Sequence, residues 1–248
     1  MRKSLSVFSV LALSVGIAMS SAPAQAALPL MANNQEMPSL APVLEQVTPA
    51  VVNISVSGKK ITRQRLPEQF RFFFGPNMPD EQVSEQPFQA LGSGVIIDAK
   101  KGYVITNAHV VAGSNSVTVQ VDDKSYDAKV VSYDPEADIS ILDAPDLPAA
   151  PLKFDMQEAA TGTGAVVMGY PGGGEFAATP ARIREVIKLN GPDIYHSTTV
   201  TREVYTIRGN VRQGNSGGPL IDGSGKVLGV VFGAAVDDAD RWVDALLK

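Results

Sequence analysis

The hexapeptide Gly214-Asn215-Ser216-Gly217-Gly218-Pro219 constrains this 248-residue chain more than any other stretch. A serine hydroxyl is a poor nucleophile at neutral pH, so it reacts only with a base to take its proton and a third group to orient that base. Flanking glycines leave room for backbone N–H groups to bind the oxyanion of a tetrahedral intermediate. The hexapeptide therefore predicts Ser216 as a nucleophile, with an oxyanion hole made by the N–H groups of Gly214 and Ser216.

The base must be one of two histidines, His109 and His196. His109 ends an apolar, β-branched run that begins at Tyr103, and this run predicts a strand entering a loop. His196 lies in a polar stretch and is expected to be a solvated loop residue. The orienting carboxylate is best assigned to Asp138, which opens another buried run. Three further aspartates lie near enough in the sequence to compete for this role: Asp134, Asp143 and Asp146.

The order His109, Asp138, Ser216 is that of the chymotrypsin-like arrangement among the unrelated folds that build such a triad. Many short β-branched runs separated by Gly, Pro, Asn and Asp predict an all-β chain. The predicted strands are Val51–Ser57, Gly94–Ile97, Tyr103–Thr106, Ser116–Val121, Ser125–Tyr133, Asp138–Leu142, Ala165–Gly169, Thr179–Ile187, Thr198–Ile207, Gly218–Ile221 and Lys226–Gly233. We expect two antiparallel β-barrels of the six-stranded type, residues 48–146 and 147–248, with the site between them.

Two groups of motifs resemble known proteases. Segments of the N-terminal half are similar to trypsin-like serine proteases of the HtrA (DegP/DegQ) group: Pro38–Pro42, Val47–Val52, Glu68–Gly75 and Leu91–Ile97. Segments of the C-terminal half resemble the actinobacterial MarP-type proteases: Val131–Pro135, Gly169–Gly174, Thr179–Glu185 and Gln213–Pro219. The resemblance implies a serine-type endopeptidase with the trypsin-like fold. Its catalytic residues fall on His109, Asp138 and Ser216.

A long insertion, residues 58–90, separates the first two predicted strands. Four of the five positions from Phe70 to Phe74 are phenylalanines, and rings of this size favour burial. In the HtrA group the corresponding region helps to build a homotrimer, so the resemblance implies trimer contact through Phe70–Phe74. Packing against the chain's own barrel and binding of a peptide are the alternatives.

The C-terminal stretch departs from the family pattern, in which a further strand completes the second barrel and lines the specificity pocket. Here Asp237–Asp240 leads into Arg241–Lys248, which predicts a short helix capped by aspartate. We therefore expect the second barrel to lack its last strand, which leaves an open sheet edge and an incomplete pocket. A proteolytically weak or inactive polypeptide-binding scaffold or chaperone is the alternative function, and an esterase with the same triad is a third.

The pocket for the residue before the scissile bond is expected to involve Asn210, Val231 and Phe232. Asn210 stands six positions before Ser216 and resembles the position at the base of the pocket in this fold. Because Asn210 carries no charge, we expect small or aliphatic residues in that pocket rather than Arg or Lys.

The first residues predict an exported protein. Arg2 and Lys3 precede an apolar run, Leu5–Met19, and the small-x-small sequence Ala24–Ala26 follows. This pattern is typical of a secretory signal peptide cleaved after about Ala26, and it indicates the periplasm. The run is short for a membrane span, which needs about 20 residues, so anchoring through residues 5–19 is the less favoured alternative. An N-terminal segment, residues 27–47, follows, with a short helix after Ser39.

Composition and motif content exclude several partners. The net charge of −5 provides no basic surface for nucleic acid. The sequence has no cysteine and no metal-ligand cluster, phosphate-binding loop or nucleotide fingerprint. We therefore expect no metal, cofactor or nucleotide, and cleavage without ATP. The resemblance implies unfolded or misfolded polypeptides as substrates, in envelope protein quality control under stress.

Overall fold

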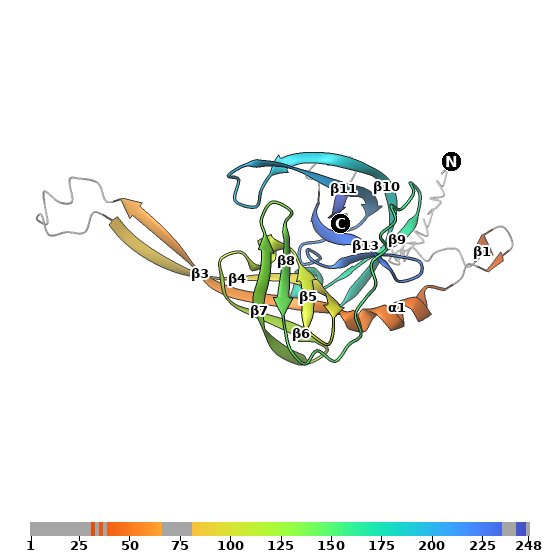
Figure 1. The fold of residues 1–248 in the computed structure, drawn as a ribbon, viewed down its shortest axis with the longest axis horizontal. Helices are drawn as coiled ribbons and strands as arrows, with labels where there is room; N and C mark the ends of the chain where they lie inside the picture. Colours follow the sequence, from red (N-terminus) through yellow and green to blue (C-terminus); the bar gives the residue numbers. More distant parts are fainter. Residues whose placement is uncertain (1–30, 33–34, 37–38, 66–80, 235–241, 247–248) are drawn as a thin grey trace, which may run out of the picture. The chain divides into compact units, whose positions relative to one another are not determined.

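The computed structural model describes residues 31–32, 35–36, 39–65, 81–234 and 242–246 (Figure 1). The chain divides into two units, Met1–Ser39 and Leu40–Lys248. In the first unit, β1 (Met31–Ala32) pairs with β2 (Gln35–Glu36) in antiparallel fashion. The predicted signal peptide lies outside the described residues. Within the described part, no helix is both long and apolar enough to cross a membrane.

The second unit begins with a short helix, α1 (Ala41–Val47), and a 3₁₀ turn, η1 (Thr48–Ala50). Six strands then form a closed antiparallel barrel in the order β3-β4-β5-β8-β7-β6. They are β3 (Val51–Arg65), β4 (Glu81–Asp98), β5 (Tyr103–Thr106), β6 (Ser114–Val121), β7 (Lys124–Asp134) and β8 (Ile139–Asp143). One helical turn, α3 (Ala108–Val111), follows β5.

A second closed barrel has the strand order β10-β11-β14-β13-β12-β9. Its strands are β9 (Gly164–Gly169), β10 (Ala177–Pro192), β11 (Thr199–Gly209), β12 (Pro219–Asp222), β13 (Val227–Ala234) and β14 (Trp242–Leu246). A 3₁₀ turn, η2 (Pro171–Gly173), lies in the loop between β9 and β10. The all-β fold of two antiparallel barrels is confirmed, and all eleven predicted strands are present; β14 is a twelfth barrel strand that the sequence did not predict.

The alternation of side chains along a strand explains how the barrels form and why they join. In β9, Ala165 and Val167 face the core of the second barrel, whereas Val166 and Met168 face a third apolar cluster. That cluster also contains Val51 and Val95 of the first barrel. Since the same strand serves both clusters, a buried apolar cluster joins the two barrels.

The insertion predicted at residues 58–90 is partly a β-ribbon. Strands β3 and β4 stay paired from Val51↔Val95 out to Arg65↔Glu81, whereas β3 pairs with β6 only as far as Gly58. The outer parts of the two strands therefore leave the barrel as a two-stranded arm, which Figure 1 shows in orange and yellow. The Phe70–Phe74 cluster lies outside the described residues, so trimer contact stays a prediction.

The expectations for the C-terminus were wrong on two points. Residues Trp242–Leu246 form a strand, β14, and not a helix. This strand pairs with β11 on one side, as at Ile207↔Val243, and with β13 on the other, as at Val231↔Ala245. Its backbone thereby satisfies two sheet edges that would otherwise be open, whereas an isolated helix of eight residues is marginal in water. The second barrel is closed, which removes the reason for expecting an inactive scaffold. The acidic residues Asp237–Asp240 lie outside the described part.

Candidate active site

The structure brings His109 and Asp138 into direct contact. The imidazole Nδ1–H of His109 donates to Asp138 Oδ2 at 2.7 Å, and the backbone N–H of His109 donates to Oδ1 at 2.9 Å. Both carboxylate oxygens are therefore used by one residue. His109 lies on α3, directly after β5, and its side chain is 37% exposed. This arrangement leaves the outer ring nitrogen, Nε2, able to act on a neighbouring group.

Asp138 is held in an uncommon backbone conformation just before β8. Its φ of 57° lies in the left-handed region, which aspartate and asparagine tolerate better than most residues. Asn107, the residue between β5 and α3, donates from Nδ2 to the carbonyl of Asp138 at 2.9 Å and so fixes this turn. Asp138 is 4% exposed. Burial and the double contact with His109 favour Asp138 over Asp134, which caps the N–H groups of Glu136 and Ala137 instead.

The nucleophile loop, residues 213–218, is fixed one peptide plane at a time. The carbonyl of Gln213 accepts from Gly172 N–H at 2.8 Å, and the carbonyl of Asn215 accepts from Gly218 N–H at 2.9 Å. In a trans peptide the N–H points opposite to the C=O. The N–H groups of Gly214 and Ser216 therefore point away from these anchors, and among the described residues neither donates to a backbone acceptor. These two groups are the predicted oxyanion donors.

Gly214 can only be glycine in this loop. Its φ is +98°, and a Cβ on it would lie 2.5 Å from the nitrogen of Gly172 and 2.6 Å from the carbonyl oxygen of Tyr170. The turn is closed by the N–H of Asn215, which donates to the carbonyl of Arg212 at 3.0 Å. Positive φ at the third position is typical of a type II turn.

The loop that carries Ser216 packs against the element that carries His109. A Cβ built on Gly92 would lie 2.7 Å from the side chain of Val110, the neighbour of His109, and 3.2 Å from the carbonyl oxygen of Ser216. The absence of a side chain at Gly92 thus lets the side chain of Val110 on α3 and the backbone of Ser216 both approach β4 at this position. The structure thus pairs His109 with Asp138 and brings the Ser216 backbone close to the neighbour of His109; the assignment of the three residues as a catalytic triad stays a prediction.

Ser93 is the site residue that sequence reasoning missed. It lies in β4 with an exposure of 0%, and it bonds to both barrels. Its N–H donates to the carbonyl of Ser216 at 2.7 Å, and its hydroxyl donates to the carbonyl of Gly214 at 2.7 Å. The same hydroxyl accepts from Tyr170 N–H at 2.9 Å. Ser93 lies within the motif Leu91–Ile97 that carried the resemblance, but a serine in a strand gives no chemical signal of its own.

The three predicted pocket residues differ in their surroundings. Val231 is 0% exposed and its side chain belongs to the core of the second barrel, so only its backbone is available to a pocket, and its assignment to the pocket stays a prediction. Its backbone also holds the nucleophile loop, because its carbonyl accepts from Gly217 N–H at 2.7 Å. Asn210 is exposed, and Phe232 is half-buried with the guanidinium of Arg202 6.0 Å from its ring centroid.

A second contact between the barrels lies beside Asp138. Buried Arg202 of β11 donates from Nε to the carbonyl of Glu136 at 2.7 Å and from Nη1 to the carbonyl of Pro192 at 3.2 Å. The hydroxyls of Tyr133 and Tyr195 bond at 2.6 Å, and burial together with this bond raises the pKa of Tyr133. The loop after β10 thus braces the turn that presents Asp138.

The same loop, residues 193–198, holds the second histidine. His196 is exposed with a φ of 57°, as expected for a solvated loop residue, and its N–H donates to the carbonyl of Asp193. Asp193 organises the loop by accepting from the hydroxyl and N–H of Ser197 and from the N–H of Tyr195. These bonds, the Ser197 hydroxyl first, hold the pKa of Asp193 below its usual range.

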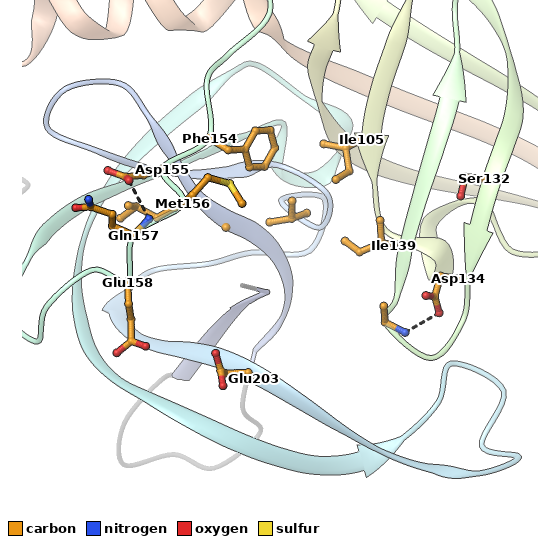
Figure 2. Close-up of a pocket in the computed structure, with 14 residues that line it drawn as sticks. Ile105, Ser132, Asp134, Ile139, Phe154, Asp155, Met156, Gln157, Glu158 and Glu203 are labelled. Atoms are coloured by element: carbon orange, nitrogen blue, oxygen red, sulfur yellow. Dashed lines mark hydrogen bonds between the residues drawn. The ribbon is translucent and has the colours of Figure 1, made fainter. Parts of the chain in front are cut away.

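A cavity of about 320 Å³ is lined by residues of both barrels and of the segment that joins β8 to β9. Figure 2 shows the residues that line it. Ala137 and Ile139, the two chain neighbours of Asp138, line it together with the linker residues Phe154–Glu158. Neither His109 nor Ser216 is among the described residues that line it. The cavity therefore lies beside the orienting carboxylate and not at the nucleophile. In the described part of the chain, no group of three or more metal-ligating side chains is present.

The fold and the site define the class of protein. Residues 92–230, more than half of the chain, match the family model of the trypsin-like peptidase domain, so the chain belongs to that family. Within this family, the chain is similar to named serine proteases, among them members of the HtrA group. It is 62% identical over 150 residues to serine protease Rv3671c of Mycobacterium tuberculosis, a match that covers 60% of this chain and 37% of that protein.

Two further comparisons cover more of the chain. The periplasmic pH-dependent serine endoprotease DegQ of Escherichia coli is 36% identical over 243 residues, which cover 93% of this chain and 50% of DegQ. The crystal structure of the Rv3671c protease in its active form matches with a TM-score of 0.67 and 49% identity over 83% of this chain and 79% of that one. The chain thus spans half or less of the length of these two curated relatives.

Proposed function

We propose that the chain is an exported serine endopeptidase that hydrolyses peptide bonds of unfolded or misfolded polypeptides without ATP. The observation that carries the proposal is the double hydrogen bond from His109 to Asp138. It is supported by the nucleophile loop, in which the N–H groups of Gly214 and Ser216 donate to no backbone acceptor among the described residues. A nucleophile, an oriented base and an oxyanion site are the parts that acyl transfer requires.

The reaction follows from these parts. Ser216 Oγ attacks the scissile carbonyl carbon while His109 Nε2 takes its proton, and the carbonyl oxygen becomes an oxyanion. Asp138 stabilises the positive charge on the imidazole, and the N–H groups of Gly214 and Ser216 bind the oxyanion. The C–N bond then breaks as His109 returns the proton to the leaving amine. Water next attacks the acyl group with His109 again as base, which releases the acid and regenerates Ser216.

The proposal extends to the substrate preference and the location of the protein. Asn210 is uncharged, so we propose small or aliphatic residues before the scissile bond; peptides cut mostly after Arg or Lys would contradict this. The relatives DegQ and DegP are named periplasmic proteins, and the sequence of residues 1–26 is typical of a signal peptide. We therefore place the protein in the periplasm, with a role in quality control of envelope proteins.

The decisive experiment is labelling of the folded chain with a fluorophosphonate, read by intact mass. Stoichiometric labelling of the wild type, and none of Ser216→Ala, is expected because phosphylation needs both the activated serine and the oxyanion site. A protein that is folded by circular dichroism but does not label would contradict the proposal. Cleavage of a denatured protein, compared with hydrolysis of a simple ester, then separates an endopeptidase from an esterase.

A further inference from the structure

Ser93 has a bonding pattern that a merely structural serine would not need. Its hydroxyl is fully used: it donates to the carbonyl of Gly214 and accepts from the N–H of Tyr170. Its backbone is used as well, since its N–H donates to Ser216 and its carbonyl accepts from the hydroxyl of Thr106 at 2.8 Å. One residue of the first barrel therefore contacts three segments that meet at the nucleophile.

The bonds of Ser93 alternate with those of the other anchors along the nucleophile loop. Gly172 and Gly218 hold the carbonyls of Gln213 and Asn215. Ser93 holds the other two carbonyls of this stretch. The Ser93 hydroxyl donates to the carbonyl of Gly214, and the Ser93 N–H donates to the carbonyl of Ser216. All four successive peptide planes are then fixed, so none of them can rotate alone.

The hydroxyl of Ser93 also acts on the anchor of the Gly214 N–H. It fixes Tyr170, two residues before Gly172, and Gly172 N–H in turn holds the carbonyl of Gln213. The Gln213–Gly214 peptide is the plane that presents the first oxyanion donor. Its orientation therefore depends on Ser93 from both sides, through the carbonyl of Gly214 and through the Tyr170–Gly172 segment.

The surroundings leave space for this serine and little else. A Cβ on Gly169 would lie 2.6 Å from Ser93 Oγ, and a Cβ on Gly217 would lie 2.1 Å from the carbonyl oxygen of Ser93. A Cβ on Gly218 would lie 3.2 Å from Ser93 Cβ. Three glycines thus allow the nucleophile loop and β9 to close directly on Ser93, and no water is needed to complete its bonds.

We propose that Ser93 is a positioning residue whose hydroxyl holds the oxyanion-binding N–H of Gly214 in its productive orientation. The inference rests on the proposed function, because it assigns to Ser93 a role in acyl transfer at Ser216. Ser93 does not touch the reacting atoms. It acts through the two peptide planes on either side of Gly214.

The test is Ser93→Ala, which removes the hydroxyl but keeps the backbone bonds to Ser216 and Thr106. We expect the fluorophosphonate labelling rate and kcat to fall by about 10- to 100-fold, with KM for a peptide changed less than threefold, since loss of one oxyanion donor costs about 10²- to 10³-fold. The matched control is Thr106→Val, which removes a buried bond to the carbonyl of the same serine but leaves Gly214 held. It is expected to label within threefold of the wild type.

Three results would overturn the proposal: Ser93→Ala labelling at the wild-type rate, equal losses in the two variants, or a loss confined to KM. If Ser93→Ala does not fold, Ser93→Cys keeps a side chain of similar shape with a weaker donor, and an intermediate labelling rate is expected from it. If Ser93→Cys labels at the wild-type rate, that result would count against the positioning role.

The experiment separates this inference from the proposed function. If the wild type itself does not label, the protease proposal fails, and Ser93 is judged by amide hydrogen exchange in the nucleophile loop. Faster exchange at Gly214, Asn215 and Ser216 in Ser93→Ala than in Thr106→Val would support the positioning role, and equal exchange in both variants would overturn it.

Discussion

The carboxylate of Asp138 receives two hydrogen bonds from His109, one from the ring Nδ1–H at 2.7 Å and one from the backbone N–H at 2.9 Å. The backbone bond fixes the carboxylate relative to α3, and the ring bond then sets the rotation of the imidazole. This geometry couples the orientation of the base to the position of its own main chain. A carboxylate held by only the ring would leave both groups free to turn together.

Replacement of Asp138 by asparagine isolates the charge of this pair. Asparagine tolerates the φ of 57° and fills the same space, so the backbone should not change. Its amide cannot stabilise the imidazolium and favours the wrong ring tautomer, so we expect kcat to fall by about 10³- to 10⁴-fold. Peptide hydrolysis measures the effect, with the melting temperature as the control for folding. A loss of less than tenfold would assign the orienting role elsewhere, and Asp134 would be tested next.

Replacement of Gly214 by alanine tests the oxyanion loop. The added Cβ would meet backbone atoms of Gly172 and Tyr170 at 2.5 and 2.6 Å, and the φ of +98° would be strained. We expect the loop to shift and kcat to fall by about 100-fold or more. Gly223→Ala is the matched control, because nothing lies within 4 Å of a Cβ at that position. Equal activity of the two variants would contradict the loop geometry.

The barrel strands could be predicted because their apolar positions alternate in the sequence itself. Alternation at Val52, Ile54 and Val56 places these side chains in the first core, and the pattern is visible without any tertiary information. The pairing of His109 with Asp138 could also be predicted, because chain order and strand ends restrict where these side chains can lie.

Features that depend on contacts between distant segments could not be predicted. Ser93 bonds to Gly214 across 121 positions, and its role exists only when the two barrels meet. β14 forms because β11 and β13 both offer it an edge, and the local sequence from Arg241 onward is equally suited to a helix. The outer ribbon of β3 and β4 was missed because its polar residues lack the alternation of a barrel strand.

Truncation of the chain after Val236 tests the closing strand. Loss of β14 removes the pairing partner of both β11 and β13, and it exposes two sheet edges at once. We expect the melting temperature to fall by about 10 °C or more and amide exchange to increase at Val204–Arg208. A chain that ends at Leu246 is the control and should behave as the full chain. Unchanged exchange in β11 after truncation would mean that β14 does not close the barrel.

Asp193 provides a prediction on pH. Its bonds from Ser197 and Tyr195 lower its pKa from the ordinary value of 3.8, so the ionised form is favoured in the folded chain. A carboxyl group whose pKa is lower in the folded state than in the unfolded state stabilises the fold at pH values above its unfolded-state pKa. This stabilisation is lost as the pH falls through the folded-state pKa. Asp193→Asn should therefore melt at a lower temperature than the wild type at pH 6. The difference should shrink below about pH 4, because the wild-type carboxyl then takes up a proton.

Thermal melts from pH 6 to pH 2.5 measure this difference in melting temperature, with Asp127→Asn at an exposed position of β7 as the control. A difference that stays constant over the whole range would mean that the Asp193 charge does not hold the loop.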